Sequence, residues 1–131
     1  MRDPREIGAI FAGGAIGAVA RYGLVEWLGK PGGDAWPWAT FVANIVACAL
    51  LGWLVTRLQE RLPLSAYKRP LVGTGVCGAL STFSTLQLEV YDLLDAGHAG
   101  VAIAYAVVSV AAGFVVVMLA SVLSRRVRTV V

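Results

Sequence analysis

The residues best suited to ion chemistry lie together in the third apolar stretch of the sequence. That stretch has three glycines within six residues and then four hydroxyl residues within five positions, and it reads Gly73-Thr-Gly-Val-Cys-Gly-Ala-Leu-Ser-Thr-Phe-Ser-Thr85. Each glycine weakens a helix by up to about 1 kcal/mol relative to alanine. A helix interrupted inside a membrane exposes backbone groups that are tolerated only where they line a cavity or bind an ion. The alternative is a kinked helix whose Ser and Thr side chains bond back to the preceding turn.

Two further polar residues interrupt apolar stretches. Asn44 follows Thr40 by four residues, and its amide carries two N–H donors that can hold either an anion or a neighbouring helix. Arg21 continues a row of small residues, Gly13 and Gly17, at a spacing of four. Such a row lets another helix approach, so we expect Arg21 to face protein or water rather than lipid. It is interpreted either as a fixed positive charge that attracts anions or as a side chain that reaches the membrane surface or caps a helix end.

The remaining candidate residues do not indicate an enzyme. Tyr105, Ser109 and Gly113 share one helical face of the fourth stretch. His98 has no partner at metal-ligand spacing, and the two cysteines form no Cys-x-x-Cys pair. There is no nucleophile–base pair, phosphate loop or nucleotide fingerprint in the sequence.

Composition identifies the elements that must position these residues. The 131 residues are 58% hydrophobic and 15% charged, with a mean hydropathy of +0.74, which excludes a disordered chain and argues against a soluble domain. A membrane-spanning helix needs about 20 mostly apolar residues. Four stretches reach that length, at residues 7–28, 36–56, 70–90 and 99–123. The sequence therefore predicts an all-α membrane protein in which residues 1–131 form one integral membrane domain and the third helix is broken near mid-membrane.

The first stretch has a second interpretation, because Arg2, Arg5 and Ala18-Val19-Ala20 resemble a signal peptide. The stretch is rich in Gly rather than Leu, and cleavage would leave Arg21 as the mature terminus. We therefore expect a retained span.

The positive charges are distributed unequally between the two sides of such a membrane protein. With four spans, the N-terminus, the second connection and the C-terminus share one side. That side holds nine of the eleven Lys and Arg residues: Arg2, Arg5, Arg57, Arg61, Lys68, Arg69, Arg125, Arg126 and Arg128. The other side holds only Lys30, and Arg21 is embedded. This bias predicts an inner (plasma) membrane protein with both termini in the cytoplasm, and it explains the net charge of +3 without a nucleic-acid partner.

Three motifs together resemble the CrcB/Fluc family of fluoride channels. They are Gly17-Ala-x-x-Arg-Tyr22, Thr40-Phe-Val-Ala-Asn44, and the stretch from Gly73 to Thr85 with Glu89 four residues further on. The resemblance extends over essentially the whole chain. It implies an antiparallel dimer of four-helix subunits that lets fluoride leave the cytoplasm passively through two pores at the subunit interface.

The resemblance also implies roles for individual residues. A structural sodium ion at the dimer centre would be held by the backbone carbonyls of Gly78 and Ser81. The fluoride pore would be formed by Asn44, Phe83, Ser84, Thr85, Tyr105, Ser109 and Arg21. The sequence departs from the family pattern at Leu86, where a second pore phenylalanine is usual, at Ala79, where glycine is frequent, and at Gly113 and Val117, where hydroxyl residues are common.

Several alternatives follow from these observations. The nine-to-one charge bias opposes the insertion in both orientations that an antiparallel homodimer requires. We therefore expect a heterodimer with a homologue of opposite topology, with a homodimer as the alternative. A small multidrug-type exporter of four helices would need a buried carboxylate in the first span, where Arg21 has the wrong sign. A non-conducting assembly subunit is the third hypothesis.

Overall fold

The computed structural model describes residues 3–59 and 66–128, and this part of the chain is helical with no strand. The elements are α1 (Pro4–Leu28), α2 (Trp38–Gln59), η1 (Pro70–Cys77), α3 (Gly78–Leu80), α4 (Phe83–Asp95) and α5 (Ala99–Arg128). α1 begins with proline after Asp3, whose side chain accepts the Arg5 N–H and so caps the helix.

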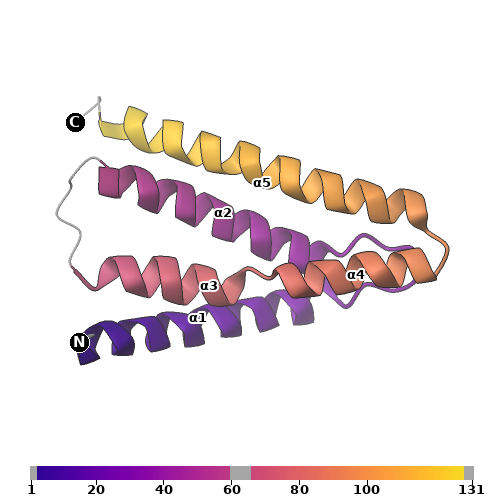
Figure 1. The fold of residues 1–131 in the computed structure, drawn as a ribbon, viewed down its shortest axis with the longest axis horizontal. Coiled ribbons are helices and arrows are strands. Elements are labelled where there is room, and N and C mark those ends of the chain that lie inside the picture. The colour runs from indigo at the N-terminus through magenta and orange to yellow at the C-terminus, as the bar shows by residue number, and fades with distance from the viewer. Residues whose placement is uncertain (1–2, 60–65, 129–131) are drawn as a thin grey trace.

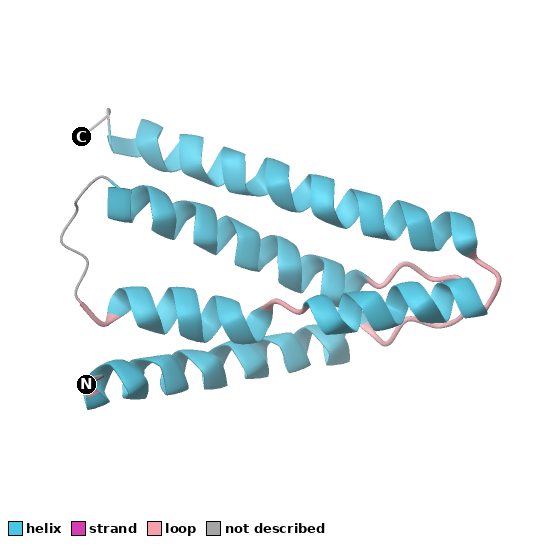
Figure 2. Cartoon of the chain, viewed as in Figure 1, coloured by secondary structure: helices cyan, strands magenta, loops and turns pink. Residues whose placement is uncertain are grey.

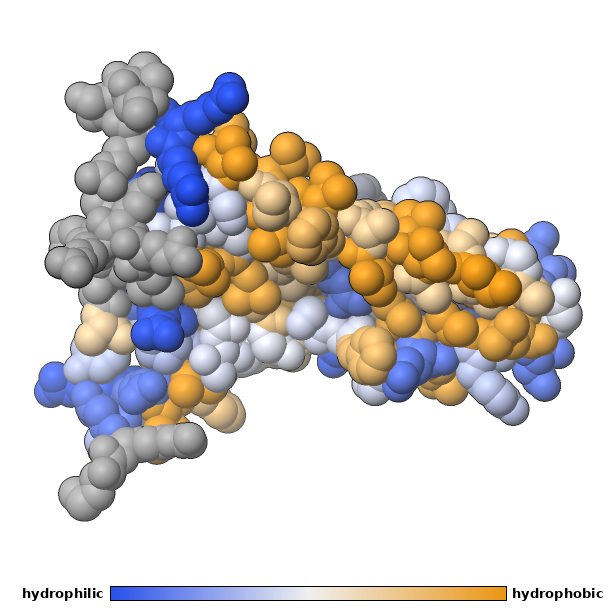
Figure 3. All heavy atoms as spheres, turned by 45° about the horizontal axis from the view of Figure 1, so that its top comes forward, coloured by the Kyte–Doolittle hydropathy of each residue, from blue (hydrophilic) through white to orange (hydrophobic). Residues whose placement is uncertain are grey.

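The four predicted membrane spans are confirmed. Helices long and apolar enough to cross a membrane cover Pro4–Leu28, Trp38–Arg57, Pro70–Asp95 and Ala99–Val127. α1 begins before residue 7 and α5 continues beyond residue 123. The apolar pattern misses these ends because each helix continues through charged residues that lie outside its apolar stretch. Figure 3 shows hydrophobic residues predominating over the middle of one face, with hydrophilic residues gathered at its two ends.

Glycines bring the helices close together. A Cβ added to Gly13 would overlap the carbonyl oxygen of Leu71, and one added to Gly75 would lie 2.8 Å from the Cα of Gly13. α1 therefore packs backbone to backbone against η1, as the row of small residues predicts. α2 packs against α5 in the same manner, since a Cβ on Gly52 would lie 2.7 Å from the carbonyl oxygen of Val117.

The third span is assembled from three helical pieces. η1 is a π-helix that leads directly into α3. Ser81 and Thr82 then have extended backbone, with ψ angles of 152° and 124°, and α4 begins at Phe83. Figures 1 and 2 show this interruption as a short loop within the span. The extended residues lie near the middle of the span and beside α2.

The bundle has two distinct ends. α1 begins, α2 ends, η1 begins and α5 ends at the same end (Figure 1). The opposite end holds the connection from α1 to α2 and the turn from α4 to α5, where Gly97 takes a positive φ of 83°. Two small cores hold the helices together, one around Ala43, Ala47, Cys77 and Leu80 and the other around Leu93, Ala102 and Tyr105.

Candidate ion site at the interrupted helix

Asn44 on α2 binds both backbone polar groups of Thr82. Its Nδ2 donates to the Thr82 carbonyl oxygen at 3.1 Å, and the Thr82 N–H donates to Asn44 Oδ1 at 2.8 Å. The side-chain amide thus replaces the helical hydrogen bonds that extended backbone cannot make. One of its two N–H donors is used in this pairing, and the other remains for a further acceptor.

The interruption changes which donors meet the carbonyls of Gly78 and Ser81. In a continuous helix the Thr82 N–H would donate to the Gly78 carbonyl and the Thr85 N–H to the Ser81 carbonyl. Here the Thr82 N–H donates to Asn44, and the Thr85 N–H donates to Thr82 Oγ1 at 3.2 Å. The two carbonyls proposed as cation ligands are those whose helical donors have been diverted.

Hydroxyl groups also bond locally around the interruption. Ser81 Oγ donates to the Cys77 carbonyl at 2.8 Å, so the back-bonding alternative describes this one residue. Thr82 acts as the N-cap of α4, and its Oγ1 also donates to Thr85 Oγ1 at 3.0 Å and lies 3.4 Å from Ser84 Oγ. The result is a capped helix N-terminus, which carries partial positive charge, at the middle of a membrane span.

Phe83 and Ser84 point away from the core of the helix bundle. Phe83 is 71% exposed, and Ser84 is also exposed. Phe83 and Leu86 contribute to an open groove of about 390 Å³ between α4 and α5, which is otherwise formed by Gln87, Val90, Tyr91, Leu94, Ala106 and Val110. The groove places the aromatic ring where another chain can contact it.

Arg21 lies beside the interruption in a separate cavity of about 380 Å³. The cavity is lined by Ala18, Arg21, Tyr22, Val25, Glu26, Lys30, Thr40, Thr82 and Thr85. The guanidinium-bearing side chain is half-buried, and it shares this cavity with hydroxyl groups of the N-cap. The structure therefore brings Arg21 together with Asn44, Ser84 and Thr85 around one residue, Thr82.

Tyr105 takes a different place. Its ring is completely buried, packs edge-on against Trp36 at 5.3 Å between centroids, and its hydroxyl donates to Glu89 Oε2 at 2.7 Å. Thr40 Oγ1 donates to Glu89 Oε1, also at 2.7 Å. Tyr105 is thus linked through Glu89 to Thr40, which lines the Arg21 cavity.

Glu89 is a residue to which the sequence interpretation assigned no role. The signal that could have identified it is general, because a carboxylate inside a membrane span is costly and is kept for a function or a partner. Ser109 stands apart from the other candidates, with a buried Oγ that has no hydrogen-bond partner among the described residues.

Polar backbone inside a membrane span, next to a cavity with a fixed positive charge, is an arrangement typical of proteins that bind or conduct ions. The fold and the site together define the class of this protein as a small multi-pass ion-transport protein. The chain belongs to the CrcB-like protein family, also described as Camphor Resistance (CrcB), which it matches over residues 8–121.

Several relatives resemble the chain over most of its length. A protein named fluoride-specific ion channel FluC 1 from Mycobacterium bovis is 55% identical over 126 residues, which cover 96% of this chain and 95% of that protein. A fluoride-specific ion channel FluC from Chloroflexus aurantiacus is 41% identical over 111 residues, 85% of this chain and 88% of the relative. One of the same name from Acidobacterium capsulatum is 36% identical over 115 residues, 88% of this chain and 92% of the relative.

Proposed function

We propose that this chain is a subunit of a fluoride-selective channel that lets fluoride leave the cytoplasm passively and so lowers fluoride toxicity. The observation that carries the proposal is the pairing of Asn44 with Thr82, which holds an interrupted helix beside the exposed ring of Phe83. Membership of the CrcB-like family and the names of the relatives support fluoride as the ion. A channel of this kind performs no covalent chemistry.

The chemistry of fluoride fits these groups. Fluoride is small and strongly hydrated, so a pore must replace its water with donors. The N-terminus of α4, the hydroxyls of Ser84 and Thr85, and the remaining N–H of Asn44 supply such donors. The rim of the Phe83 ring is electropositive and can contact the anion directly. Arg21 raises the positive potential of the adjoining cavity and so concentrates anions there.

A structural sodium ion remains part of the proposal. The carbonyls of Gly78 and Ser81 are suitable ligands, because their usual helical donors bond to Asn44 and Thr82 instead. Oxygen ligands suit a hard cation, and the described residues contain no cluster of three or more His, Cys, Asp or Glu side chains that could hold a metal. When bound, the cation would add positive potential next to the anion path.

Assembly as an antiparallel dimer is supported by the surface beside the interruption. An aromatic ring that is 71% exposed next to polar backbone leaves a pore wall incomplete in one chain, and a second chain against the α4–α5 groove would complete it. The charge bias favours a heterodimer with a homologue of opposite topology over a homodimer. The same bias supports an orientation with both termini in the cytoplasm, and we propose the inner membrane as the location.

The other hypotheses gain less support. A multidrug-type exporter needs a buried carboxylate in the first span, but Glu26 is exposed near the end of α1. A non-conducting assembly subunit would fit Leu86, because an aliphatic side chain takes the place of a second aromatic rim in the groove.

A pair of matched substitutions tests the proposal. Phe83→Ile removes the aromatic rim, and we expect it to abolish fluoride efflux from liposomes. Phe114→Ile makes the same change at an equally exposed ring on α5, 68% exposed, and should leave efflux unchanged. Equal efflux from both folded variants would contradict the pore assignment.

A further inference from the structure

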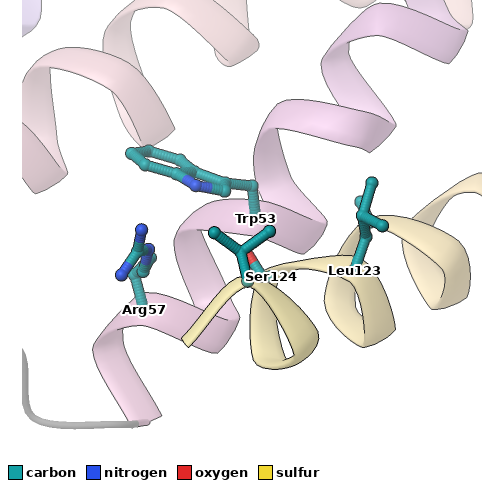
Figure 4. Close-up of a pocket in the computed structure, with 6 residues that line it drawn as sticks. Trp53, Arg57, Leu123 and Ser124 are labelled. Atoms are coloured by element: carbon teal, nitrogen blue, oxygen red, sulfur yellow. The ribbon is translucent and has the colours of Figure 1, made fainter. Parts of the chain in front are cut away.

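A second cavity lies between α2 and α5, at the end of the bundle where α2 ends and α5 ends. It measures about 230 Å³ and is lined by Trp53, Arg57, Ala120, Leu123, Ser124 and Val127. Figure 4 shows Trp53 and Arg57 entering it from α2 and Leu123 and Ser124 from α5. It shares no residue with the interrupted helix or the Arg21 cavity.

Two polar atoms in this cavity are buried without hydrogen-bond partners among the described residues. They are Nε of Arg57 and Oγ of Ser124, and Ser124 is only 7% exposed. The Arg57 guanidinium carbon also lies 5.9 Å from the centroid of the Trp53 ring, a contact that holds it over the cavity. Buried donors without partners are rare in folded proteins, so a ligand that brings acceptor oxygens is the simplest explanation of the pair.

The position of the cavity identifies the kind of ligand. Arg57 is the last residue of the apolar span of α2, so its guanidinium lies at the depth of the lipid headgroups. Leu123 and Val127 are 65% and 57% exposed and offer an apolar surface next to the polar pair. An occupant with acceptor oxygens at one end and a hydrocarbon chain at the other matches both features.

We propose that this cavity binds an anionic phospholipid, with its phosphate oxygens accepting hydrogen bonds from Arg57 and Ser124 and an acyl chain along Leu123 and Val127. Exposed Arg125 lies next to Ser124 in the sequence and adds positive charge at the same end of α5. Basic sites of this kind favour anionic over zwitterionic headgroups, because each nearby Lys or Arg strengthens the attraction. With the proposed orientation, the lipid belongs to the cytoplasmic leaflet.

Native mass spectrometry of the purified full chain, titrated with phosphatidylglycerol or phosphatidylcholine, tests this site. We expect phosphatidylglycerol to bind the wild type about fivefold more tightly than phosphatidylcholine, and Arg57→Gln to remove that preference. Ser124→Ala should weaken phosphatidylglycerol binding about threefold through loss of one donor. Arg69→Gln is the matched control, because it removes an exposed positive charge at the same end of the bundle but outside the cavity, and it should change binding less than about twofold.

Several outcomes would overturn the proposal. One is unchanged lipid preference in Arg57→Gln, and another is displacement of phosphatidylglycerol by millimolar inorganic phosphate, which would make the site one for free anions. A third is that only monomers bind lipid and that Arg57→Gln changes the fraction of dimer. That result would show that a second copy of the chain covers the cavity. If Arg57→Gln fails to fold by circular dichroism, Arg57→Lys and Ser124→Ala decide the question. Arg57→Lys keeps the charge without Nε and should bind with intermediate affinity, and wild-type affinity in both variants would refute the site.

Discussion

Replacing Asn44 with alanine removes both hydrogen bonds that hold Thr82 at the interruption. A buried backbone group left without a partner costs about 1–3 kcal/mol, and two groups are affected. Because the site is only partly buried, water can replace part of this loss, and we expect destabilisation of about 2–3 kcal/mol. A loss of about 2 kcal/mol lowers the ratio of folded to unfolded protein about thirtyfold. Because Thr82 precedes Phe83 at the start of α4, we also expect fluoride efflux per folded protein to fall.

Asn44→Asp separates the two hydrogen bonds. The aspartate retains an acceptor for the Thr82 N–H, but it places a second oxygen against the Thr82 carbonyl, where Nδ2 donated. We expect a folded protein in which fluoride efflux is abolished, since the carboxylate also repels the anion. Thr56→Val is the control, because it removes one side-chain hydrogen bond, to the Gly52 carbonyl at 2.9 Å, from the same helix but away from the interruption.

Fluoride-electrode recordings of liposome efflux and thermal unfolding in detergent measure the two effects. If Asn44→Ala matched Thr56→Val in both stability and efflux, Asn44 would not hold the interrupted helix.

Three other predictions concern the helix packing, the hydrogen-bonded carboxylate of Glu89 and the charge distribution. Gly17→Ala should prevent close packing of α1 on η1 and lower the yield of folded protein, because its Cβ would overlap the carbonyl oxygen of Val76. Gly14→Ala is the control, since a Cβ there meets open space and should be tolerated. Equal yields of the two variants by gel filtration would contradict this. Glu89→Ala leaves the buried hydroxyls of Thr40 and Tyr105 without their acceptor, so the free energy of unfolding should fall by about 2–5 kcal/mol. Tyr105→Phe should lower it by less. An unchanged free energy of unfolding in both variants would argue against the hydrogen-bonded carboxylate. Tags on either terminus should stay unlabelled in intact cells and should be labelled once the cells are permeabilised. Equal labelling from both sides, with robust fluoride efflux by this chain alone, would rule out the obligate heterodimer.

The four spans could be predicted because length and hydropathy alone decide whether a helix can cross a membrane. The tight packing of α1 could also be predicted, since Gly13 and Gly17 share one face and admit the backbone of η1. Local sequence marked the third span as unusual through its glycines and hydroxyls. It could not place the extended residues at Ser81 and Thr82, because their position depends on Asn44, 38 residues away in the sequence.

Side-chain burial was the least predictable property. Tyr105 and Ser109 share a helical face, but only the tertiary fold turns Tyr105 inward onto Glu89 and Trp36. The α2–α5 cavity was also beyond sequence reasoning. From the sequence, Arg57 was considered only as one of the charges that set the membrane orientation. Arg57 and Ser124 are 67 residues apart in the sequence, and they meet only because α2 packs against α5.

Reconstitution in liposomes measures whether this chain provides a path for fluoride. Purified protein in liposomes, alone and with a homologue of opposite charge bias, is compared with protein-free liposomes for passive fluoride and chloride efflux. We expect fluoride efflux well above the protein-free rate in at least one of the two preparations, with chloride efflux at the background level. Background fluoride efflux in both preparations, or equal efflux of the two anions, would contradict it.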